Sequence, residues 1–366
     1  MRVSRYTSIS KVRTLTASMA ALALAGSLAA CGGDSGSSED SKTAGEVTLM
    51  GYAGVVQDNY TKAVVEPFME KYPDIKVNYV PGASASEMLG TLRSEQGDPN
   101  SDVAIFDISV ANTGNKEGIF QPLDPERIPN MADIDERGKV EGNFGPAVTF
   151  DNLVLLYNTD TVEQAPTSWD ALWSEDVAGD VVIDAAPDLQ GLSLMVIIDK
   201  MQGADYKDTI DPAVEKLADL SPNVQSWAPN PDPYTMITNG SASMGIGWNA
   251  RAQFYADESD GKLGVAIPEE GSVFQTNSIN LVKGSDSPKA AQTFINYALT
   301  PEVQAAFTEQ MFYAPTNTKA KVSEETASRT ATTPERQAEI IDVDWNYIAE
   351  HNDAWTDIWR REILGG

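Results

Sequence analysis

The chain has 366 residues, a formal net charge of −28, one histidine and one cysteine. So acidic a chain repels nucleic acid, and a lone cysteine has no partner for an intrachain disulfide. Metal sites and nucleophile–base pairs depend largely on His and Cys, so we expect no metal, no cofactor and no enzymatic activity.

The chain starts with a segment typical of a secretory signal. Four basic residues within the first 13 positions precede an apolar run from Leu15 to Ala30, which is too short to span a bilayer comfortably. The small residues before Cys31 resemble the lipobox of bacterial lipoproteins, in which this cysteine is acylated and becomes the first residue. We therefore expect a signal peptide over residues 1–30, lipidation of Cys31 and an extracytoplasmic protein anchored at the outer face of the cell membrane. Cleavage removes four positive charges and no acid, which takes the net charge from −28 to −32.

A polar stretch rich in Gly and Ser covers residues 31–45 and predicts a flexible tether. After it, hydrophobic periodicity predicts strands at 46–52, 75–80 and 102–106, and helices at about 59–71 and 86–95. Strands that alternate with helices at this spacing indicate a parallel sheet with right-handed crossovers. The class we expect is therefore α/β.

The rest of the chain repeats this pattern. It predicts strands at 148–157, 180–183, 242–248, 263–267 and 278–282. It predicts helices at 169–173 (capped by Ser168), 191–201, 211–220, 234–239, 249–256, 288–299 and 302–309.

The only histidine, His351, lies in a helical segment at 343–359. One stripe of that helix carries Trp345, Ile348, Asn352, Trp355 and Trp359. His351 lies at or beside the edge of the stripe, which favours a packing or surface role over that of a catalytic base. A lipid-anchored hydrolase that uses only carboxylates is an alternative, but nothing singles out a pair among the 54 acidic residues.

Four segments, taken in order, resemble the bacterial extracellular solute-binding proteins of ABC importers, and within them the spermidine/putrescine-binding-like group. The segments are 153–160 (LVLLYNTD), 166–173 (PTSWDALW), 245–252 (GIGWNARA) and 290–304, which contains Phe294-Ile295-Asn296-Tyr297. The resemblance implies a two-lobed periplasmic-binding-protein-like fold of type II with the ligand in a cleft between the lobes. We expect crossovers near 143–149 and 275–281. The first lobe then comprises 46–147 and 281–366, including the C-terminal helix, and the second lobe comprises 148–280.

The same resemblance implies the partners. They are a small-molecule solute, the permease subunits of an ABC importer, and the membrane through the lipid anchor, for a protein that we expect to be a monomer. An anion-binding transport protein, for an organophosphonate or a carboxylate, is a further alternative, as is a signalling or adhesion module with the same fold.

The resemblance also carries over candidate ligand-binding residues. They are Tyr52, Asp107, Ser109, Asp188, Trp248 and Tyr313. Each also has a structural interpretation, since Trp248 and Tyr313 can pack in a core and Asp188 can cap a loop. In the family's polyamine site an aromatic and a charged residue stand where this chain has Gln275 and Asn277.

The neutral amides at these two positions and the nearby Arg251 change the charge of the expected site. A second buried ammonium group would lack a partner, and such a loss typically costs several kcal/mol. Arginine suits a carboxylate through bidentate contact. We therefore expect a solute with one positive charge, such as a short amine or an amino-acid-like zwitterion, rather than a long polyamine.

Overall fold

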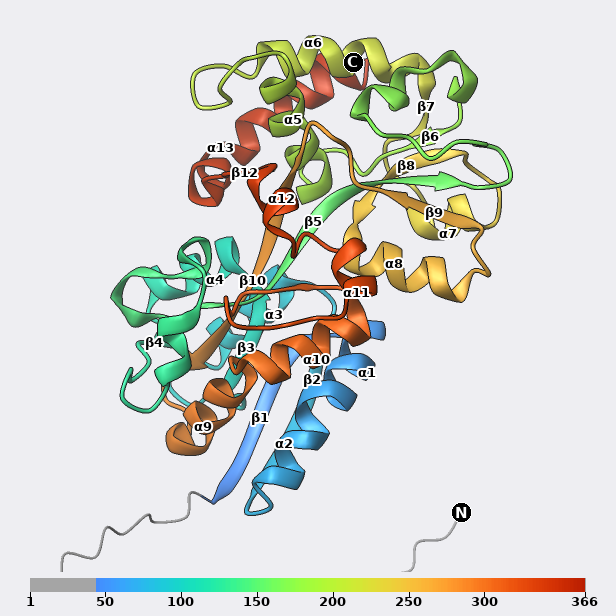
Figure 1. Cartoon of the computed structure of the whole chain (residues 1–366). Helices are drawn as coiled ribbons and strands as arrows, with labels where there is room; N and C mark the ends of the chain where they lie inside the picture. The colour runs from blue at the N-terminus through green and yellow to red at the C-terminus, as the bar shows by residue number, and fades with distance from the viewer. Residues whose placement is uncertain (1–43, 366) are drawn as a thin grey trace, which may run out of the picture. The chain divides into compact units, whose positions relative to one another are not determined.

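The computed structural model describes residues 44–365, and its strands form one mixed sheet (Figure 1). The eight strands of the main path follow the spatial order β2-β1-β3-β10-β5-β8-β6-β7. Their bounds are β1 Gly45–Tyr52, β2 Ile75–Gly82, β3 Val103–Asp107, β5 Ala147–Asn158, β6 Val181–Val182, β7 Val224–Ser226, β8 Met244–Trp248 and β10 Ser272–Val282. Four short strands pair alongside this path, namely β4 Phe120–Gln121, β9 Leu263–Ala266, β11 Ala314–Pro315 and β12 Ile340–Ile341.

Most of the α-helices follow the predicted periodicity, but those at Glu324–Ser328 and Pro334–Ala338 were not predicted. The bounds of the α-helices are α1 Val55–Tyr60, α2 Glu66–Lys71, α3 Ala85–Ser94, α4 Ile108–Glu117, α5 Leu189–Met201, α6 Asp211–Leu220, α7 Pro233–Thr238, α8 Asn249–Glu258, α9 Pro288–Ala298, α10 Pro301–Met311, α11 Glu324–Ser328, α12 Pro334–Ala338 and α13 Trp345–Ile358. The helix expected from residue 59 begins earlier, and a π-helical turn at Thr61–Val65 joins α1 to α2. Ser168 caps its helix as expected, but Trp169–Trp173 is a short 3-10 helix, and a second 3-10 turn follows at Glu175–Val177.

The sheet is mixed, with parallel pairs at its ends and antiparallel pairs in its middle. β1 is parallel to β2 and β3, as the alternation of strands and helices predicts. The strand predicted at 278–282 is only the end of β10, which begins at Ser272 and runs antiparallel to both β3 and β5. The first part of β5 pairs with β10, and its second part pairs with β8 and β9. β5 and β10, the crossing strands, therefore belong to both ends of the sheet.

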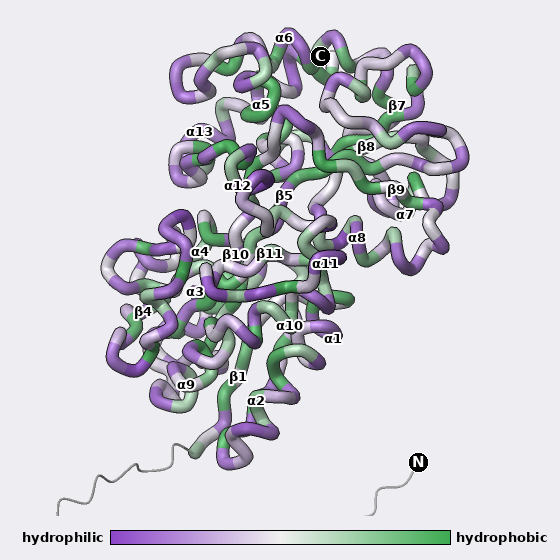
Figure 2. The backbone as a smooth tube through the Cα atoms, in the orientation of Figure 1, coloured by the Kyte–Doolittle hydropathy of each residue, from purple (hydrophilic) through white to green (hydrophobic). Residues whose placement is uncertain are grey.

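Buried side chains gather in two main groups, one at each end of the sheet. Strands β1–β3 with helices α1, α2, α9 and α10 surround one group, which includes Leu49, Phe68 and Phe294. The second part of β5 with β8, α5 and α6 surrounds the other, which includes Leu155 and Trp169. Figure 2 shows the hydrophobic segments concentrated along β1, β5 and β8, with hydrophilic residues on the outer turns. These groups supply a physical basis for the proposed division into lobes.

The C-terminal helix packs on a different partner from the one we expected. Its apolar stripe, with Trp355 and Trp359, is buried in the core around α5 and α6 rather than with α9 and α10 (Figure 1). Periodicity identifies which face of a helix is apolar, but it does not identify which of two available cores will cover that face. His351 stacks on Tyr347 at 4.0 Å, in agreement with the packing role expected for it.

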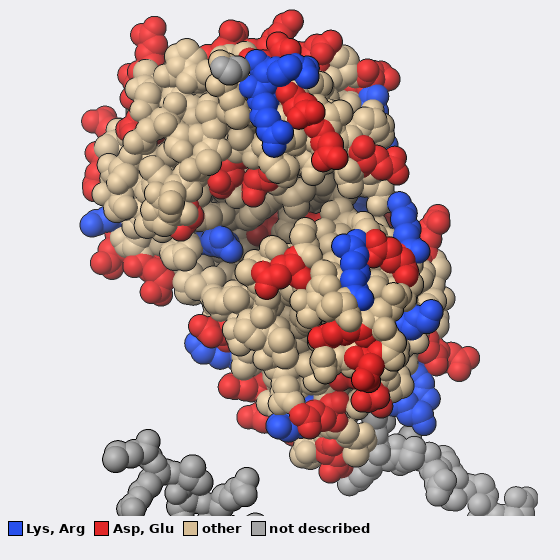
Figure 3. Space-filling view, turned by 180° about the vertical axis from the view of Figure 1, so that it is seen from behind, with Lys and Arg blue, Asp and Glu red and all other residues tan. Residues whose placement is uncertain are grey.

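The signal peptide, Cys31 and nearly all of the tether lie outside the described residues. Between residues 44 and 365, no helix combines the length and the apolar character that crossing a membrane requires. Acidic side chains are spread over the face shown in Figure 3, as the net charge predicts.

Candidate functional site

A row of polar side chains lies across β3, β10 and β5. Asn277 on β10 is opposite both Asp107 on β3 and Thr149 on β5. Its Nδ2 donates to Thr149 Oγ1 at 3.1 Å, and its Oδ1 accepts from Gln275 Nε2 at 3.2 Å. Gln275 Nε2 also lies 3.5 Å from Asp107 Oδ2. Successive residues of a strand alternate between faces, so Gln275 and Asn277 point to the same side of the sheet.

Asp107 ends β3 and caps α4. Its Oδ1 accepts hydrogen bonds from the backbone N–H of Ser109 at 2.9 Å and from Ser109 Oγ at 2.5 Å. The side chain is 6% exposed, and this burial raises the pKa of its carboxyl, while the bonds from Ser109 and Gln275 oppose the rise. Most of the acceptor capacity of Asp107 is therefore used by the protein itself.

Aromatic side chains line the space beside this row. Tyr52 Oη accepts the backbone N–H of Asp107 at 3.1 Å, and Tyr79 Oη donates to the carbonyl of Tyr52 at 2.8 Å. A small cavity of about 20 Å³ is lined by Tyr52, Val56, Tyr60, Tyr79, Ile105, Thr149, Asn277, Phe307 and Tyr313. Burial raises the pKa of the Tyr52 and Tyr313 phenols, so both stay neutral and present aromatic faces.

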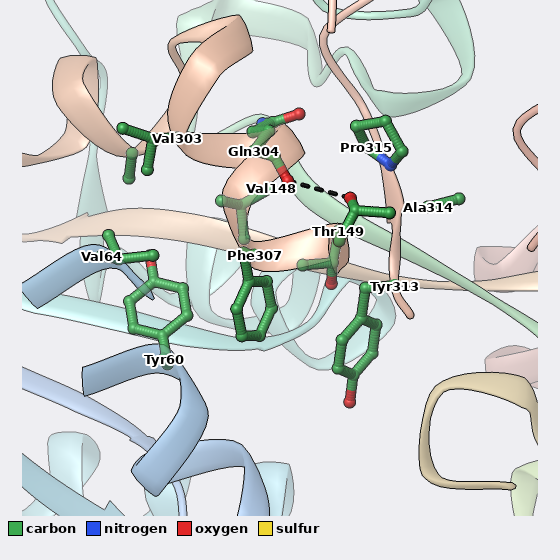
Figure 4. Close-up of a pocket in the computed structure, with 12 residues that line it drawn as sticks. Tyr60, Val64, Val148, Thr149, Val303, Gln304, Phe307, Tyr313, Ala314 and Pro315 are labelled. Atoms are coloured by element: carbon green, nitrogen blue, oxygen red, sulfur yellow. Dashed lines mark hydrogen bonds between the residues drawn. The ribbon is translucent and has the colours of Figure 1, made fainter. Parts of the chain in front are cut away.

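A second pocket adjoins the first and shares four of its lining residues. It measures about 10 Å³, and its wall is formed mainly by α10, β11 and the start of β5, with Tyr60 and Val64. Figure 4 shows the rings of Phe307 and Tyr313 side by side, and these rings stack at 5.5 Å with 12° between their planes. The phenol oxygen of Tyr313 points away from Val303 and Gln304. Tyr313 thus has both the packing role considered above and a place in the first pocket.

The remaining candidates lie around the start of α8 and α5. Trp248 ends β8, is half-buried, and donates its backbone N–H to Tyr234 Oη at 2.7 Å. The exposed Arg251 guanidinium lies 5.7 Å from the centroid of the Tyr234 ring. Asp188 caps α5 by accepting the N–H of Gln190 at 2.8 Å, which is the structural role considered for it.

Negative charge gathers near Arg251. Burial raises the pKa of Asp188, and the positive charge of Arg251 opposes that rise. Burial, followed by the charges of Asp188 and Asp232, raises the pKa of Asp184 to about 6. This part of the site therefore combines a guanidinium with carboxyl groups, which suits a ligand carrying both signs of charge.

The structure thus arranges the predicted residues in two sets. Hydrogen bonds or the shared pocket join the first set: Tyr52, Asp107, Ser109, Gln275, Asn277 and Tyr313. Trp248, Arg251 and Asp188 form the second set. Tyr313 lies between the sets, because it shares the first pocket with Tyr52 and its phenol is close enough to Arg251 to be affected by that positive charge.

Three polar residues near these sets were missed in the sequence, namely Thr149, Asp151 and Asp184. Thr149 and Asp151 stand at alternate positions in a largely apolar strand, and this pattern was the signal that could have identified them. No group of three or more His, Cys, Asp or Glu side chains is placed to hold a metal ion within residues 44–365.

Comparisons with known proteins agree with the resemblance seen in the sequence. The model of a family described as bacterial extracellular solute-binding protein matches residues 63–338. The chain is 29% identical over 220 residues to the gamma-aminobutyric acid-binding protein of Pseudomonas aeruginosa, a match that covers 55% of this chain and 58% of that relative. It is 25% identical over 320 residues to the spermidine/putrescine-binding periplasmic protein of Salmonella typhimurium, a match that covers 84% of this chain and 90% of the relative.

A solved structure matches nearly the whole described chain. It is the crystal structure of an ABC transporter from Clostridium perfringens, with 25% sequence identity and a TM-score of 0.71. The match covers 87% of this chain and 99% of that chain.

Proposed function

Since the chain belongs to the bacterial extracellular solute-binding protein family, we propose that it captures a small amine-bearing solute for an ABC importer. The periplasmic-binding-protein-like fold expected from the sequence is confirmed by the solved structure it matches. The family consists of solute-binding transport proteins rather than enzymes. We propose that the solute is released to the permease subunits of the importer and that the protein acts as a monomer.

The charge of the site supports a solute with one ammonium group. Asp107 is buried beside two neutral amides, Gln275 and Asn277, so this part of the site does not pair two cations. Asp107 and Asp188 are candidate anchors for the ammonium group, and Arg251 is a candidate partner for a carboxylate. An amino-acid-like zwitterion satisfies both signs of charge. The names of the relatives, which include binding proteins for gamma-aminobutyric acid and for polyamines, support an amine of some kind.

The aromatic side chains suit the rest of such a solute. Tyr52 and Tyr313 line one pocket, and we propose that Trp248 stacks on the ligand from the other set. An aromatic face adds favourable contact with an ammonium group and covers its methylene groups.

We also propose that the protein works outside the cytoplasm, held at the membrane by a lipid on Cys31. The basic head, the apolar run and the small residues before this cysteine support the anchor.

A thermal-shift screen of the purified mature protein tests the function. The compounds are monoamines, amino acids, polyamines, sugars and organophosphonates. A ligand present at 1,000 times its Kd stabilises the folded protein by about 4 kcal/mol, so micromolar binders are evident at millimolar concentration. We expect shifts with a short amine or zwitterion. Shifts with sugars or organophosphonates alone would contradict the proposal.

Calorimetry with spermidine, putrescine and 4-aminobutyrate then tests the charge of the solute. We expect 4-aminobutyrate or another singly ammonium-bearing compound to bind more tightly than spermidine. Submicromolar binding of spermidine, with weaker binding of every monoamine, would show that the neutral Asn277 does not exclude polyamines.

A further inference from the structure

Asp151 lies on the same side of the crossing strands as the polar row of the site. It is opposite Gln275 in the pairing of β5 with β10, and it stands two residues after Thr149. Opposite residues of antiparallel strands share a face, as do alternate residues of one strand. Thr149, Asp151, Gln275 and Asn277 therefore form one surface, which we call the front face.

Asp151 is buried, yet only one of its carboxylate oxygens is used by the protein. Its side chain is 2% exposed. Oδ1 accepts the backbone N–H of Ala250 at 3.0 Å and that of Asn152 at 2.9 Å, and the backbone N–H of Asn249 also lies near the carboxyl. Among the residues that the structure describes, none donates a hydrogen bond to Oδ2. Asp107 differs, since protein donors lie near both of its oxygens.

The groups around Asp151 come from three further elements. Arg251 on α8, Tyr234 on α7 and Tyr313 before β11 all interact with it electrostatically. Within residues 44–365, Arg251 makes no ion pair within 4.0 Å, and its guanidinium lies over the Tyr234 ring instead. Burial raises the pKa of Asp151 to about 7, while the N–H donors and Arg251 oppose the rise. A buried carboxylate and an exposed guanidinium thus stand near each other without pairing.

We propose that Asp151 is a further ligand-binding residue, whose Oδ2 accepts the ammonium group of the solute while Arg251 holds its carboxylate. This inference rests on the proposed function and specifies which residues bind the two charged groups of the solute. The two residues together select a zwitterion, since each satisfies one sign of charge and both lie beside the aromatic Tyr313. When Asp151 is protonated, the incoming ammonium displaces that proton, which passes to the solvent as the carboxylate–ammonium pair forms.

The alternative is that Asp151 serves only as a cap for α8, through its bond to Ala250. Asp199 provides a matched control for that role. It is likewise buried, its Oδ1 accepts the backbone N–H of Ala213 at 3.0 Å near the start of α6, and burial raises its pKa to about 6. Its Oδ2 also has no hydrogen-bond partner among the described residues, so what distinguishes Asp151 is its place on the front face near Arg251. The negative charges near it are those of Asp205 and Asp211, neither of which belongs to the site.

The experiment is calorimetry of the mature protein and of Asp151→Asn, Asp107→Asn and Asp199→Asn, with 4-aminobutyrate and butyrate as probes. Each titration is run near pH 7 in two buffers of different ionisation enthalpy, which gives the number of protons released. For wild type we expect binding of 4-aminobutyrate with proton release. For Asp151→Asn we expect about 100-fold weaker binding without proton release, because an ion pair loses its partner.

Butyrate separates a binding role from a structural one. It lacks the ammonium group, so Asp151→Asn should bind it at least as well as wild type does. Asp199→Asn should retain both the affinity for 4-aminobutyrate and the proton release.

Two outcomes would overturn the inference. In the first, Asp151→Asn keeps the affinity and the proton release of wild type while Asp107→Asn loses binding. That result would assign the ammonium group to Asp107. The other is an equal loss of 4-aminobutyrate and butyrate in Asp151→Asn, which would mean that Asp151 only shapes the fold. If wild type binds no amine or zwitterion in the screen, the proposed function itself fails, and this result is distinct from both.

Discussion

The indole Nε1 of Trp345 donates a hydrogen bond to the backbone carbonyl of Phe274 at 2.9 Å. This bond fastens the first residue of α13 to β10, one of the two crossing strands. The Phe274 ring stacks on Phe150 at 4.7 Å with 5° between the planes, and the Arg137 guanidinium lies 5.1 Å from its centroid. The side of the crossing strands opposite the front face is thus held by aromatic contacts and by the C-terminal helix.

Trp345→Phe should lower the free energy of unfolding by about 1 kcal/mol, because it removes this bond and leaves the Phe274 carbonyl without its partner. Urea unfolding followed by circular dichroism measures the change. Trp227→Phe is the control, since Trp227 is also half-buried but packs against Trp359 without an indole hydrogen bond in the described structure. Equal losses in the two variants would mean that the bond contributes nothing.

Asp199→Asn should change how stability depends on pH. Burial raises the pKa of Asp199 from 3.8 to about 6, so between these values the folded protein binds more protons than the unfolded chain. The free energy of unfolding therefore falls as pH rises through this window, and the variant lacks this contribution. The free energy of unfolding of Asp199→Asn, minus that of wild type, should therefore be higher at about pH 7 than at about pH 4. Parallel stability curves over this range would contradict the expectation.

Trp248→Ala should weaken binding of the solute by about 1–3 kcal/mol if the indole stacks on it, while Trp248→Phe should retain most of the affinity. Ligand binding should also quench the tryptophan fluorescence of wild type. Calorimetry and fluorescence titration measure the two effects. Unaltered affinity in the double variant Trp248→Ala/Asp188→Asn would move the site elsewhere.

Asn277→Asp should shift selectivity toward solutes with two ammonium groups. The new carboxylate would lie beside Gln275 and opposite Asp107, where it adds a second buried negative charge. The ratio of the Kd for 4-aminobutyrate to that for putrescine should rise by about tenfold or more. Stability without ligand should fall, because like charges repel in a buried site. Asn277→Ser is the neutral control, and the same ratio in both variants would argue against a role for charge here.

Cys31→Ser should release the protein from the membrane or leave it unprocessed, because the hydroxyl does not provide the thiol that carries the lipid. Cell fractionation and the mass of the mature protein measure the outcome. Processing and membrane association like those of wild type would show that the anchor lies elsewhere.

The order of strands and helices was accessible from the sequence because it depends on local periodicity. The alternation in Val47–Leu49 and the stripe in α9 each arise from neighbouring residues. Most predicted bounds differ from the observed ones by a few residues, although the strand predicted at 278–282 covers only the end of β10. The order of the motifs around Trp248 and Phe294 likewise indicated the family, which the comparison confirms.

The site was only partly accessible. Tyr52, Asp107 and Asn277 were identified by resemblance, but the bonds that join them depend on β3 and β10 lying side by side. Asp151 was not identified because the sequence does not show which face of the sheet a polar residue in a strand lies on. Its neighbours Arg251 and Tyr313 are far away in the chain and meet it only in the folded protein.

The sequence by itself determined the elements, the family and the acidic, histidine-poor chemistry of this protein, since all three depend on composition and short-range pattern. The tertiary structure alone decided which core covers the C-terminal helix, which buried carboxylate faces the site near Arg251, and how the two sets of site residues meet around Tyr313. These features come from contacts between residues far apart in the chain, where side-chain shape and burial select one arrangement among several that the same pattern allows.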